Sequence, residues 1–532
     1  MFGHIHSTVP PWDGTTATRR LDVATAKWRC RVNIACAAVL LALLSQVAQA
    51  QLNVASVFSD HAVIQRDKPL IVWGMAKPKA NVSVTFGSEA AETVAGGEGR
   101  WRVTLKEQPA SVSPQTLVVR SDGHAIRRTD ILIGDVWHAS GQSNMRMTMG
   151  AVLKSLPEVE QLAGPFDQSG IRFFKIDEGP SRTPRSEFSS GPQWTECSDD
   201  SVRSLSAAAF CFAATIHADV GVPIGIIDTA RGGTPIEPFI PVSAFGSHPV
   251  LQRERQLGDK DDLDGIWRLP GGVRARNTNW LPGRLFNSRV APILEYAVRG
   301  CIWYQGESNC GVQEDPRDYQ HKMRALIQGW RQQLQNEELP FYFVQLPGYG
   351  PGSNWPYLRE QQRLAADVAN SGMVVTIDLE HPDIHPPNKF DVGNRLAKWA
   401  LARHYGRHIA FSGPSFARAK ITGGQVVVEF AHADSGLMVA NKSGLGPAVE
   451  EKDGVLNHFE ITTDGGAWHP AKAVILEKTV VVSNAEIVAP IAVRYAYSPA
   501  PTRCNLFNRD GLPASPFCSR PELLECDPGL PK

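Results

Sequence analysis

Hydrophobic and polar positions alternate along this chain with two different periods, and the period changes near residues 130 and 410. Between residues 51 and 130, apolar residues often stand at every second position, as in Val82, Val84 and Phe86. Clusters of Gly, Asp and Pro separate these short runs. Because successive side chains of a strand point to opposite faces, the pattern predicts an N-terminal β-sandwich module over residues 51–130.

Residues 131–410 combine apolar runs typical of buried strands with longer stretches typical of helices. This alternation predicts an α/β domain whose parallel sheet is covered by helices on both faces. Residues 241–280 are polar and irregular, and we interpret them as an insertion near one edge of the sheet. The expected strands are 131–138, 171–176, 224–227, 300–304, 341–346 and 374–378, and the expected helices are 207–220, 318–334, 357–368 and 389–403.

The alternating pattern of strands returns after residue 410. Ile491, Val493, Tyr495 and Tyr497 show it most clearly. We therefore predict a second, C-terminal β-sandwich-like module over residues 411–517. Residues 518–532 have no periodicity and form a predicted tail.

The first fifty residues have the three parts of a secretory signal peptide. Five basic residues between Arg19 and Arg31 precede an apolar run over 34–44, and small residues follow at Ala48 and Ala50. The run is shorter than the roughly 20 apolar residues that span a bilayer. A buried helix is the alternative, but the charges before the run and the small residues after it favour export. We expect a signal peptide over residues 1–50, cleaved near Ala50, and a periplasmic or secreted mature chain.

Charge argues against a nucleic-acid partner. The chain has 54 basic and 54 acidic residues, whereas binding to phosphates requires a basic excess or a basic face. Residues 1–50 contain five of the basic and two of the acidic residues, so the remaining chain has a formal charge of −3. No later segment is long and apolar enough to predict a membrane partner, and charge does not indicate an oligomeric state.

Cysteine spacing gives no indication of a metal site. Seven of the nine cysteines lie outside the predicted signal peptide, and an exported chain can form disulfides. We expect Cys504 to pair with Cys518 or Cys526 and so close a terminal loop. There is no CxxC pair and no HExxH pair, so we expect neither a metal nor a cofactor.

Four polar clusters follow four of the predicted strands. In open α/β sheets the ligand crevice lies at the carboxyl ends of the strands, so these clusters are expected to meet there. Together they supply a serine on a tight glycine turn, paired glycines, side-chain amides and a histidine. The clusters are Ser140–Met145, Arg231–Pro235, Gln305–Asn309 and Asp383–Pro386.

These clusters resemble the sequence blocks of the sialate O-acetylesterase-like family of SGNH hydrolases. The strings GQSNM at 141–145 and WYQGESN at 303–309 are the most specific, and GDVW at 134–137, GGTPIE at 232–237 and DIHP at 383–386 accompany them. The resemblance covers about residues 52–517. It implies an SGNH-type three-layer α/β/α core with a parallel sheet, flanked by the two β modules, and the chemistry of a serine esterase.

The resemblance also implies roles for individual residues. Ser143 would be the nucleophile, and His385 would be the general base and then the acid for the leaving group. Asp383 would orient the histidine. Because some relatives lack an acid at this place, a Ser-His dyad remains an alternative, and Asp378 or a backbone carbonyl could replace Asp383.

The oxyanion hole is expected to combine backbone and side-chain donors. The resemblance assigns the N–H groups of Ser143 and of Gly232 or Gly233, together with the side-chain amide of Gln305. Asn309 is the alternative to Gln305. The remaining polar residues of the blocks are interpreted as supporting hydrogen-bond donors and acceptors that brace the loops, namely Gln142, Asn144 and Glu307.

The implied substrate is an acetylated saccharide, and sialate is favoured within the family. An acetylxylan or acetylxyloglucan type of hemicellulose esterase is the second hypothesis, because fold does not determine substrate. Arg231 stands where many relatives have Trp, which puts the substrate in question more than the mechanism. Ser143 and His385 argue against a noncatalytic glycan-binding protein, and no cluster of metal ligands supports a metal-dependent deacetylase.

Overall fold

The computed structural model describes residues 52–526, except 165, 247–248, 250, 253–254, 257–280, 311–315 and 352–353. The predicted signal peptide and most of the predicted insertion lie outside the described residues. Within the described part, no helix has the length and hydrophobicity needed to cross a membrane.

A mixed sheet forms the centre of the molecule, and strand β8 (His124–Gly141) lies in its middle. The strand order is β10-β9-β11-β8-β12-β13-β14. All neighbours from β9 to β14 are parallel, and only the edge strand β10 is antiparallel. The bounds are β9 Gln168–Lys175, β10 Trp194–Cys197, β11 Ile224–Asp228, β12 Gly300–Tyr304, β13 Phe341–Val344 and β14 Ser371–Val374.

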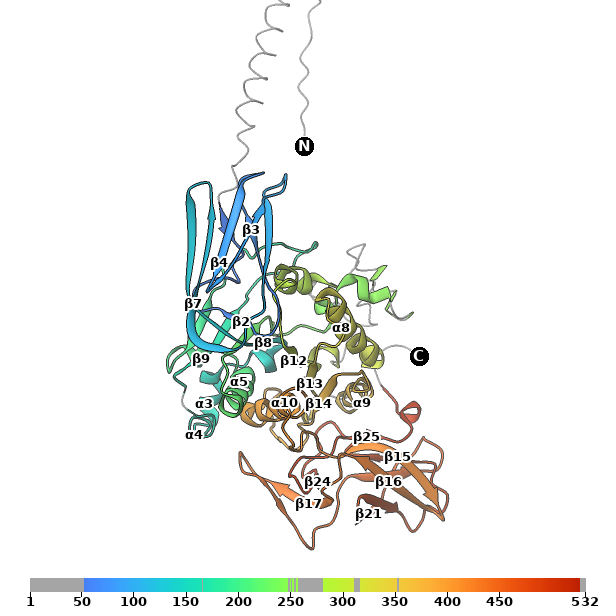
Figure 1. The fold of residues 1–532 in the computed structure, drawn as a ribbon. Coiled ribbons are helices and arrows are strands. Elements are labelled where there is room, and N and C mark those ends of the chain that lie inside the picture. Colours follow the sequence, from blue (N-terminus) through green and yellow to red (C-terminus); the bar gives the residue numbers. More distant parts are fainter. Residues whose placement is uncertain are drawn as a thin grey trace, which may run out of the picture. The chain divides into compact units, whose positions relative to one another are not determined.

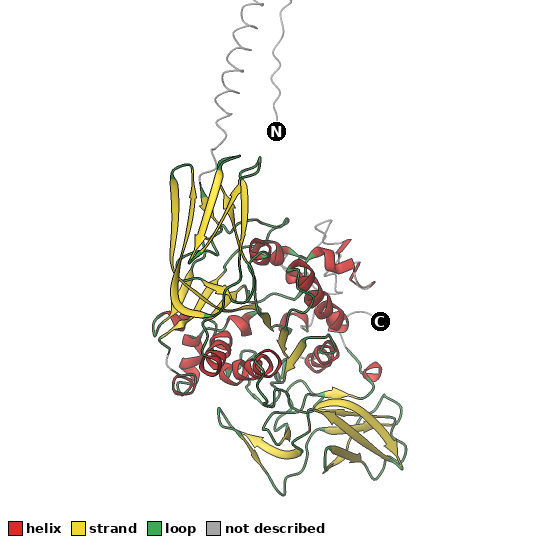
Figure 2. Ribbon diagram, viewed as in Figure 1, coloured by secondary structure: helices red, strands yellow, loops and turns green. Residues whose placement is uncertain are grey.

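Helices pack on both faces of this sheet, as Figure 2 shows. Phe341 of β13 contacts Trp330 of α8 (Tyr319–Gln333), with ring centroids 6.0 Å apart. The next residue, Tyr342, contacts Trp399 of α10 (Lys389–His404) at 5.9 Å. Since neighbouring residues of a strand point to opposite faces, α8 and α10 cover different faces. Helix α5 (Ala207–Val220) packs beside α10, and α9 (Trp355–Ala365) packs beside α8, which confirms the predicted α/β class.

The first half of β8 belongs to the N-terminal β-rich region (Figure 1). It pairs antiparallel with β7 (Ser111–Ser121) and parallel with β2 (Val63–Gln65). Strand β7 in turn pairs with β4 (Asn81–Phe86), which pairs with β5 (Glu89–Val94). A separate sheet has the order β1-β3-β6, with bounds Asn53–Val54, Leu70–Met75 and Arg100–Leu105. Strand β8 thus runs without a break through residue 130, and the sandwich character and the domain boundaries remain predictions.

Three small antiparallel sheets make up the C-terminal region, again β-rich as predicted. The first has the order β15-β16-β22-β21, with bounds Ser415–Thr422, Gln425–Ala431, Thr479–Ser483 and Lys472–Leu476. The second is β18-β17-β24, with bounds Ala448–Glu450, Leu437–Lys442 and Leu506–Asn508. The third is β20-β19-β23-β25, with bounds His469–Pro470, Phe459–Thr462, Ala492–Tyr495 and Phe517–Cys518.

Two details of the sequence prediction are wrong. The strand expected over 374–378 is β14, which begins at Ser371 and ends at Val374. Beyond it, the Asp378 carboxylate binds the guanidinium of Arg395, with an N–O distance of 2.6 Å. The bridge expected at Cys504 is not formed either, because its buried thiol lies 3.9 Å from the carbonyl oxygen of Pro501 and makes no disulfide.

Candidate active site

The predicted nucleophile stands on a sharp turn at the carboxyl end of β8. Gly141 has a φ of 130°, and a Cβ atom at this position would lie 2.1 Å from the carbonyl oxygen of Tyr304 in β12. Only glycine fits such a close approach of two strands. The chain then turns directly into the short helix α2 (Ser143–Arg146), so that Ser143 is half-buried at the edge of the sheet.

His385 reaches this serine from the loop between β14 and α10. Its Nε2 atom lies 2.8 Å from Ser143 Oγ. This is the hydrogen-bond distance that a general base needs to take the hydroxyl proton. The structure therefore brings together two residues that are 242 positions apart in the sequence.

Asp383 lies on the far side of the imidazole. Its Oδ1 is 3.3 Å from His385 Nδ1 and also accepts a hydrogen bond of 2.7 Å from the backbone N–H of His385. This backbone N–H and the nearby imidazole lower the pKa of the Asp383 carboxyl, which is therefore charged at neutral pH. Its side chain is 60% exposed, so solvent weakens its effect on the histidine. The alternative Asp378 is bound to Arg395 instead.

The paired glycines of the second block lie beside the nucleophile. A Cβ atom on Gly232 would be 3.7 Å from the Cβ of Ser143, and Gly232 is exposed. Gly233 adopts a φ of 67°, which favours glycine. The backbone N–H of Arg231 donates to the carbonyl of Gly141 at 2.9 Å and ties this loop to the turn that carries the serine.

Gln305 and Asn309 lie in a buried hydrogen-bond network behind the site. Gln305 Nε2 donates to Gln142 Oε1 at 3.1 Å and to Asn309 Oδ1 at 2.8 Å. Asn309 Nδ2 donates to both carboxylate oxygens of Glu237, at 3.1 and 3.2 Å. The N–H groups of both amides are thus already engaged with buried acceptors.

Two backbone donors determine the orientation of these amides. The N–H of Ser308 donates to Gln142 Oε1 at 3.1 Å, and the N–H of Ile236 donates to Asn309 Oδ1 at 2.9 Å. The oxygen of each amide must face its backbone donor. Gln142 Nε2 consequently points elsewhere and has no hydrogen-bond partner among the described residues. Of the three amides, that of Gln142 is the one that can donate to a ligand.

A second buried network holds the histidine loop. Asn144 Nδ2 donates to Glu307 Oε1 at 2.5 Å and to the carbonyl of Ile384 at 2.9 Å. The ammonium group of Lys389 donates to Asn144 Oδ1 at 2.7 Å and to the carbonyl of Pro386. Since Ile384 and Pro386 flank His385, the network positions the loop on both sides of the histidine.

Burial changes the protonation of this second network. It raises the pKa of Glu307 and lowers that of Lys389 to about 7, although the nearby Glu307 partly opposes the change on the lysine. The sequence analysis did not single out Lys389 as a site residue. Lysine is rarely buried, and the first turn of a helix disfavours a cation, so nothing local marked its position.

Three arginines gather next to the glycine loop. Arg146 and the fully buried Arg289 both bind Asp177, each with an N–O distance of 3.0 Å. Arg231 donates only to the carbonyl of Glu178, at 3.3 Å, and has no carboxylate partner among the described residues. The guanidinium of Arg231 therefore lies at the Glu178 carbonyl without a carboxylate partner among the described residues.

A group of metal-ligand side chains occurs away from this site. His61, Asp130 and Glu196 offer ligand atoms within 4.8 Å of one another. The guanidinium of Arg172, however, lies between the two carboxylates, at 2.9 Å from Asp130 and 3.1 Å from Glu196. Because an arginine always carries its charge, this group is better described as an ion-pair network than as a metal centre.

Comparison with known proteins agrees with this geometry. The family model of the sialic acid-specific acetylesterases, a group of carbohydrate esterases, matches residues 270–402. A sialate O-acetylesterase from Rattus norvegicus is 26% identical over 551 residues, which cover 91% of this chain and 97% of the relative. The corresponding protein from Homo sapiens is 25% identical over 512 residues, with 87% and 91% covered. The crystal structure of a carbohydrate acetylesterase from Xanthomonas citri superposes with a TM-score of 0.76 at 32% identity, with 88% of this chain and 99% of that chain covered.

The fold, the site and these relatives define a carboxylic ester hydrolase of the carbohydrate esterase class. Within that class, the chain belongs to the sialate O-acetylesterase-like family of the SGNH hydrolases, as its sequence blocks indicated.

Replacing Lys389 with Met should lower kcat/KM for a small acetyl ester by roughly 10- to 100-fold, since a loosened His385 loop misplaces the base. The change should also alter the pH dependence of stability. Between pH 7 and 10.5 the unfolded wild-type chain binds a proton on Lys389 that the folded chain lacks. As the pH increases through this range, the free energy of unfolding of the wild type should therefore rise relative to that of the variant, by about 1 kcal/mol per pH unit.

Urea unfolding at pH 7, 8 and 9 measures this difference. Lys398→Met, on the same helix and only half-buried, is the matched control and should change neither quantity. Unchanged activity and an unchanged pH profile in the Lys389→Met protein would contradict the positioning role.

Proposed function

We propose that this protein is an exported serine esterase that removes O-acetyl groups from carbohydrates, with acetylated sialate as its substrate. The observation that carries this proposal is the 2.8 Å contact between Ser143 Oγ and His385 Nε2 at the carboxyl end of the sheet. The rat and human relatives, both named sialate O-acetylesterases, support the substrate.

In the first step, His385 takes the proton of Ser143 while Oγ attacks the acetyl carbonyl. The tetrahedral intermediate then collapses, and the imidazolium gives its proton to the sugar oxygen as the ester bond breaks. In the second step, His385 removes a proton from water, which attacks the carbonyl of the acetyl-serine. The imidazolium then returns this proton to Ser143 Oγ as the acyl–oxygen bond breaks and acetate leaves. Asp383 stabilises the imidazolium that forms in each step.

We propose an oxyanion hole of three donors. Two are the backbone N–H groups of Ser143 and Gly232, and the support for this pair is that a Cβ atom on Gly232 would lie 3.7 Å from Ser143 Cβ. The third is Gln142 Nε2, which has no hydrogen-bond partner in the described part of the chain, in place of the expected Gln305 amide. Gln305 and Asn309 then act indirectly, because they hold Gln142 in its orientation. A donor of this kind stabilises the transition state by about 3 kcal/mol.

Arg231 supports an acidic substrate over a neutral one. Its guanidinium, which has no carboxylate partner among the described residues, can bind the carboxylate of a sialic acid, whereas the second hypothesis, a hemicellulose acetylesterase, gives this charge no function. Export follows from the signal peptide expected over residues 1–50. The β-rich flanking regions are proposed to be sandwich modules that support the catalytic core.

Ser143→Ala should lower kcat/KM for a chromogenic acetyl ester by about 10⁴-fold or more, because no other nucleophile lies beside His385 among the described residues. The matched control is Ser140→Ala, which removes from the end of β8 a buried hydroxyl that has no hydrogen-bond partner among the described residues. Activity that survives in Ser143→Ala would show that the serine mechanism is wrong. Activity that is lost on treatment with chelators would point to a metal instead.

The substrate class can be determined by comparing acetate release from O-acetylated sialic acid and from acetylated xylan. We expect the sialic acid to be preferred, and Arg231→Gln to lower its kcat/KM about tenfold while the chromogenic ester is unaffected. Equal loss on all substrates would show that Arg231 supports the loop. A preference for xylan would establish the hemicellulose alternative.

Asp383→Asn distinguishes a triad from a dyad. We expect a loss of roughly 10- to 100-fold in kcat, less than for a buried triad aspartate, because solvent already screens this exposed carboxylate. Steady-state kinetics at neutral pH measure the loss. A change of less than about threefold would establish a Ser-His dyad.

A further inference from the structure

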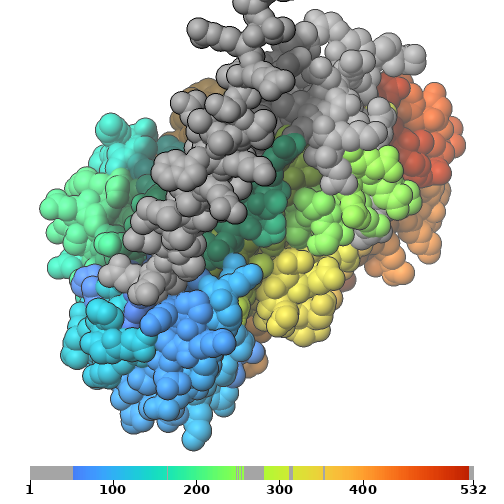
Figure 3. Space-filling view, turned by 90° about the horizontal axis from the view of Figure 1, so that it is seen from above, coloured from blue at the N-terminus to red at the C-terminus, as the bar shows by residue number. Residues whose placement is uncertain are grey.

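A cleft of about 1010 Å³ lies between the N-terminal sheet β1-β3-β6 and the catalytic core. Figure 3 shows the N-terminal strands (blue) beside the chain near residue 330 (yellow), and the cleft lies between these two segments. Its volume is at the upper end of the range for small-molecule sites, about 300–1,000 Å³. None of the residues assigned to the esterase site lines it.

One wall is the outward face of strands β3 and β6. In their antiparallel register, Trp73 stands opposite Arg102 and Met75 opposite Arg100. Directly paired residues share a face, so this wall combines apolar and cationic side chains. The intervening residues of both strands are buried on the other face, which holds the wall rigid.

Trp73 is the aromatic platform of the cleft. Its ring packs edge-on against Phe58, with centroids 5.0 Å apart and an interplanar angle of 80°. Its own side chain is half-buried, and its indole N–H has no hydrogen-bond partner among the described residues. A fixed indole with one open face and a free donor can stack on the C–H face of a sugar ring and bind a hydroxyl group.

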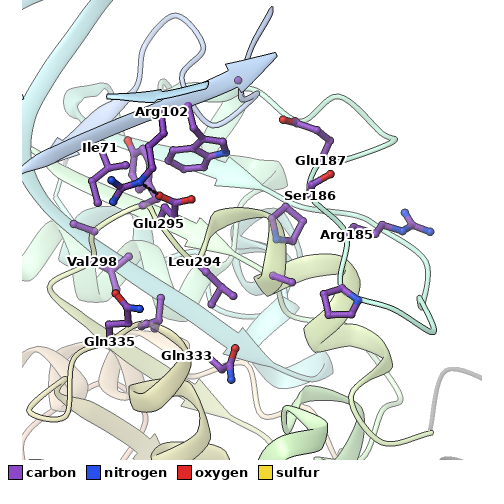
Figure 4. A pocket seen from close by; sticks show the side chains of 18 of the residues that line it. Ile71, Arg102, Arg185, Ser186, Glu187, Leu294, Glu295, Val298, Gln333 and Gln335 are labelled. Atoms are coloured by element: carbon purple, nitrogen blue, oxygen red, sulfur yellow. Dashed lines mark hydrogen bonds and ion pairs between the residues drawn. The ribbon is translucent and has the colours of Figure 1, made fainter. Parts of the chain in front are cut away.

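The opposite walls supply polar groups, as the close-up in Figure 4 shows. Glu295 comes from the segment before β12 and forms an ion pair with Arg102 across the cleft. Ser186 and Glu187 extend from a loop at one side, and Gln335 lies at the other end. Such alternation of apolar surface and hydrogen-bonding groups suits a polyhydroxylated ligand.

The charges of the cleft favour an acidic ligand. Arg102 and Arg185 are neutralised by Glu295 and Glu178. Lys68 and Arg100 are exposed and belong to no ion pair of the described residues. Glu187 offsets one of these two cations; burial raises the pKa of its carboxyl, and the nearby Arg100 opposes that change. A carboxylate-bearing sugar matches the remaining positive charge.

The cleft and the esterase site lie at opposite ends of the same strands. Val298 and Leu339, which line the cleft, stand two residues before the first residues of β12 and β13, whereas Gln305 follows β12. A five-residue strand such as β12 spans about 16 Å. A ligand in the cleft therefore does not contact Ser143, and the two sites can be occupied together.

We propose that this cleft is a second saccharide-binding site, which takes an acidic sugar of the substrate glycan and stacks it on Trp73 beside Arg100. It anchors the enzyme on glycans that carry several acidic sugars, because a second attachment raises the effective concentration of substrate at Ser143. This inference rests on the proposed function only in assuming an acidic carbohydrate substrate.

The test is titration calorimetry of sialyllactose and of lactose, which lacks only the acidic sugar, into the Ser143→Ala protein. We expect sialyllactose to bind and lactose to bind at least about tenfold more weakly. Trp73→Ala should weaken sialyllactose about tenfold, and Arg100→Gln should remove most of the preference over lactose. Arg100 is exposed and forms no ion pair among the described residues, so its variant reports on binding even where Trp73→Ala fails to fold.

Kinetics of the otherwise wild-type variants provide the second readout. In Trp73→Ala and Arg100→Gln, hydrolysis of a chromogenic ester should stay within about twofold of wild type, while kcat/KM on an acetylated sialoglycoprotein falls about tenfold. Arg127→Gln, an exposed arginine outside the cleft, is the matched control. Undiminished sialyllactose binding in Arg100→Gln, or equal affinity for lactose, would overturn the proposal. Because binding is measured without the nucleophile, failure of the serine mechanism leaves this result unaffected.

Discussion

The close contact between β8 and β12 at Gly141 is the constraint on which the site depends. The register pairs Gly141 with Tyr304, and the two backbones approach so closely that a Cβ atom would overlap the Tyr304 carbonyl. The turn that carries Ser143 therefore begins at the level where β12 ends and Gln305 begins. The hydrogen bond from the backbone N–H of Arg231 to the carbonyl of Gly141 attaches the glycine loop at the same point. Three loops that are distant in sequence thus converge through the backbone of one residue.

Buried polar networks give these loops the rigidity that loops usually lack. A buried amide or charge is costly unless it is hydrogen-bonded, so each network tolerates few alternative arrangements. Asn144, Glu307 and Lys389 hold the histidine loop, and Gln142, Gln305 and Asn309 hold the opposite side. Both networks draw residues from the same sequence blocks, but each network holds a different loop. This division explains why the family blocks contain more amides and charges than the chemistry itself uses.

The sequence predicted the parts of this architecture that local patterns determine. Strand β12 and helix α5 have the predicted bounds, since runs of buried apolar residues identify both. The region after β14 was predicted wrongly because Val375 and Ile377 have a strand-like pattern, while Arg395 and Gln345 hold Asp378 and Thr376 outside the ladder. The hydrogen bonds of Gln305 and the burial of Lys389 depend on groups that are far away in the sequence. No pattern of neighbouring residues contains that information.

The esterase site and the cleft at the other end of the sheet have one electrostatic feature in common. The chain without residues 1–50 has a formal charge of −3, yet Arg231 in one place and Arg100 in the other form no ion pair among the described residues, although Glu187 lies near Arg100. At physiological salt the field of a single exposed cation is screened within about 8 Å. Neither arginine can therefore attract an acidic glycan over a long distance against the net charge. In the roles proposed for them, the two arginines act after contact and discriminate between acidic and neutral sugars, which is the kind of selectivity that local charge complementarity provides.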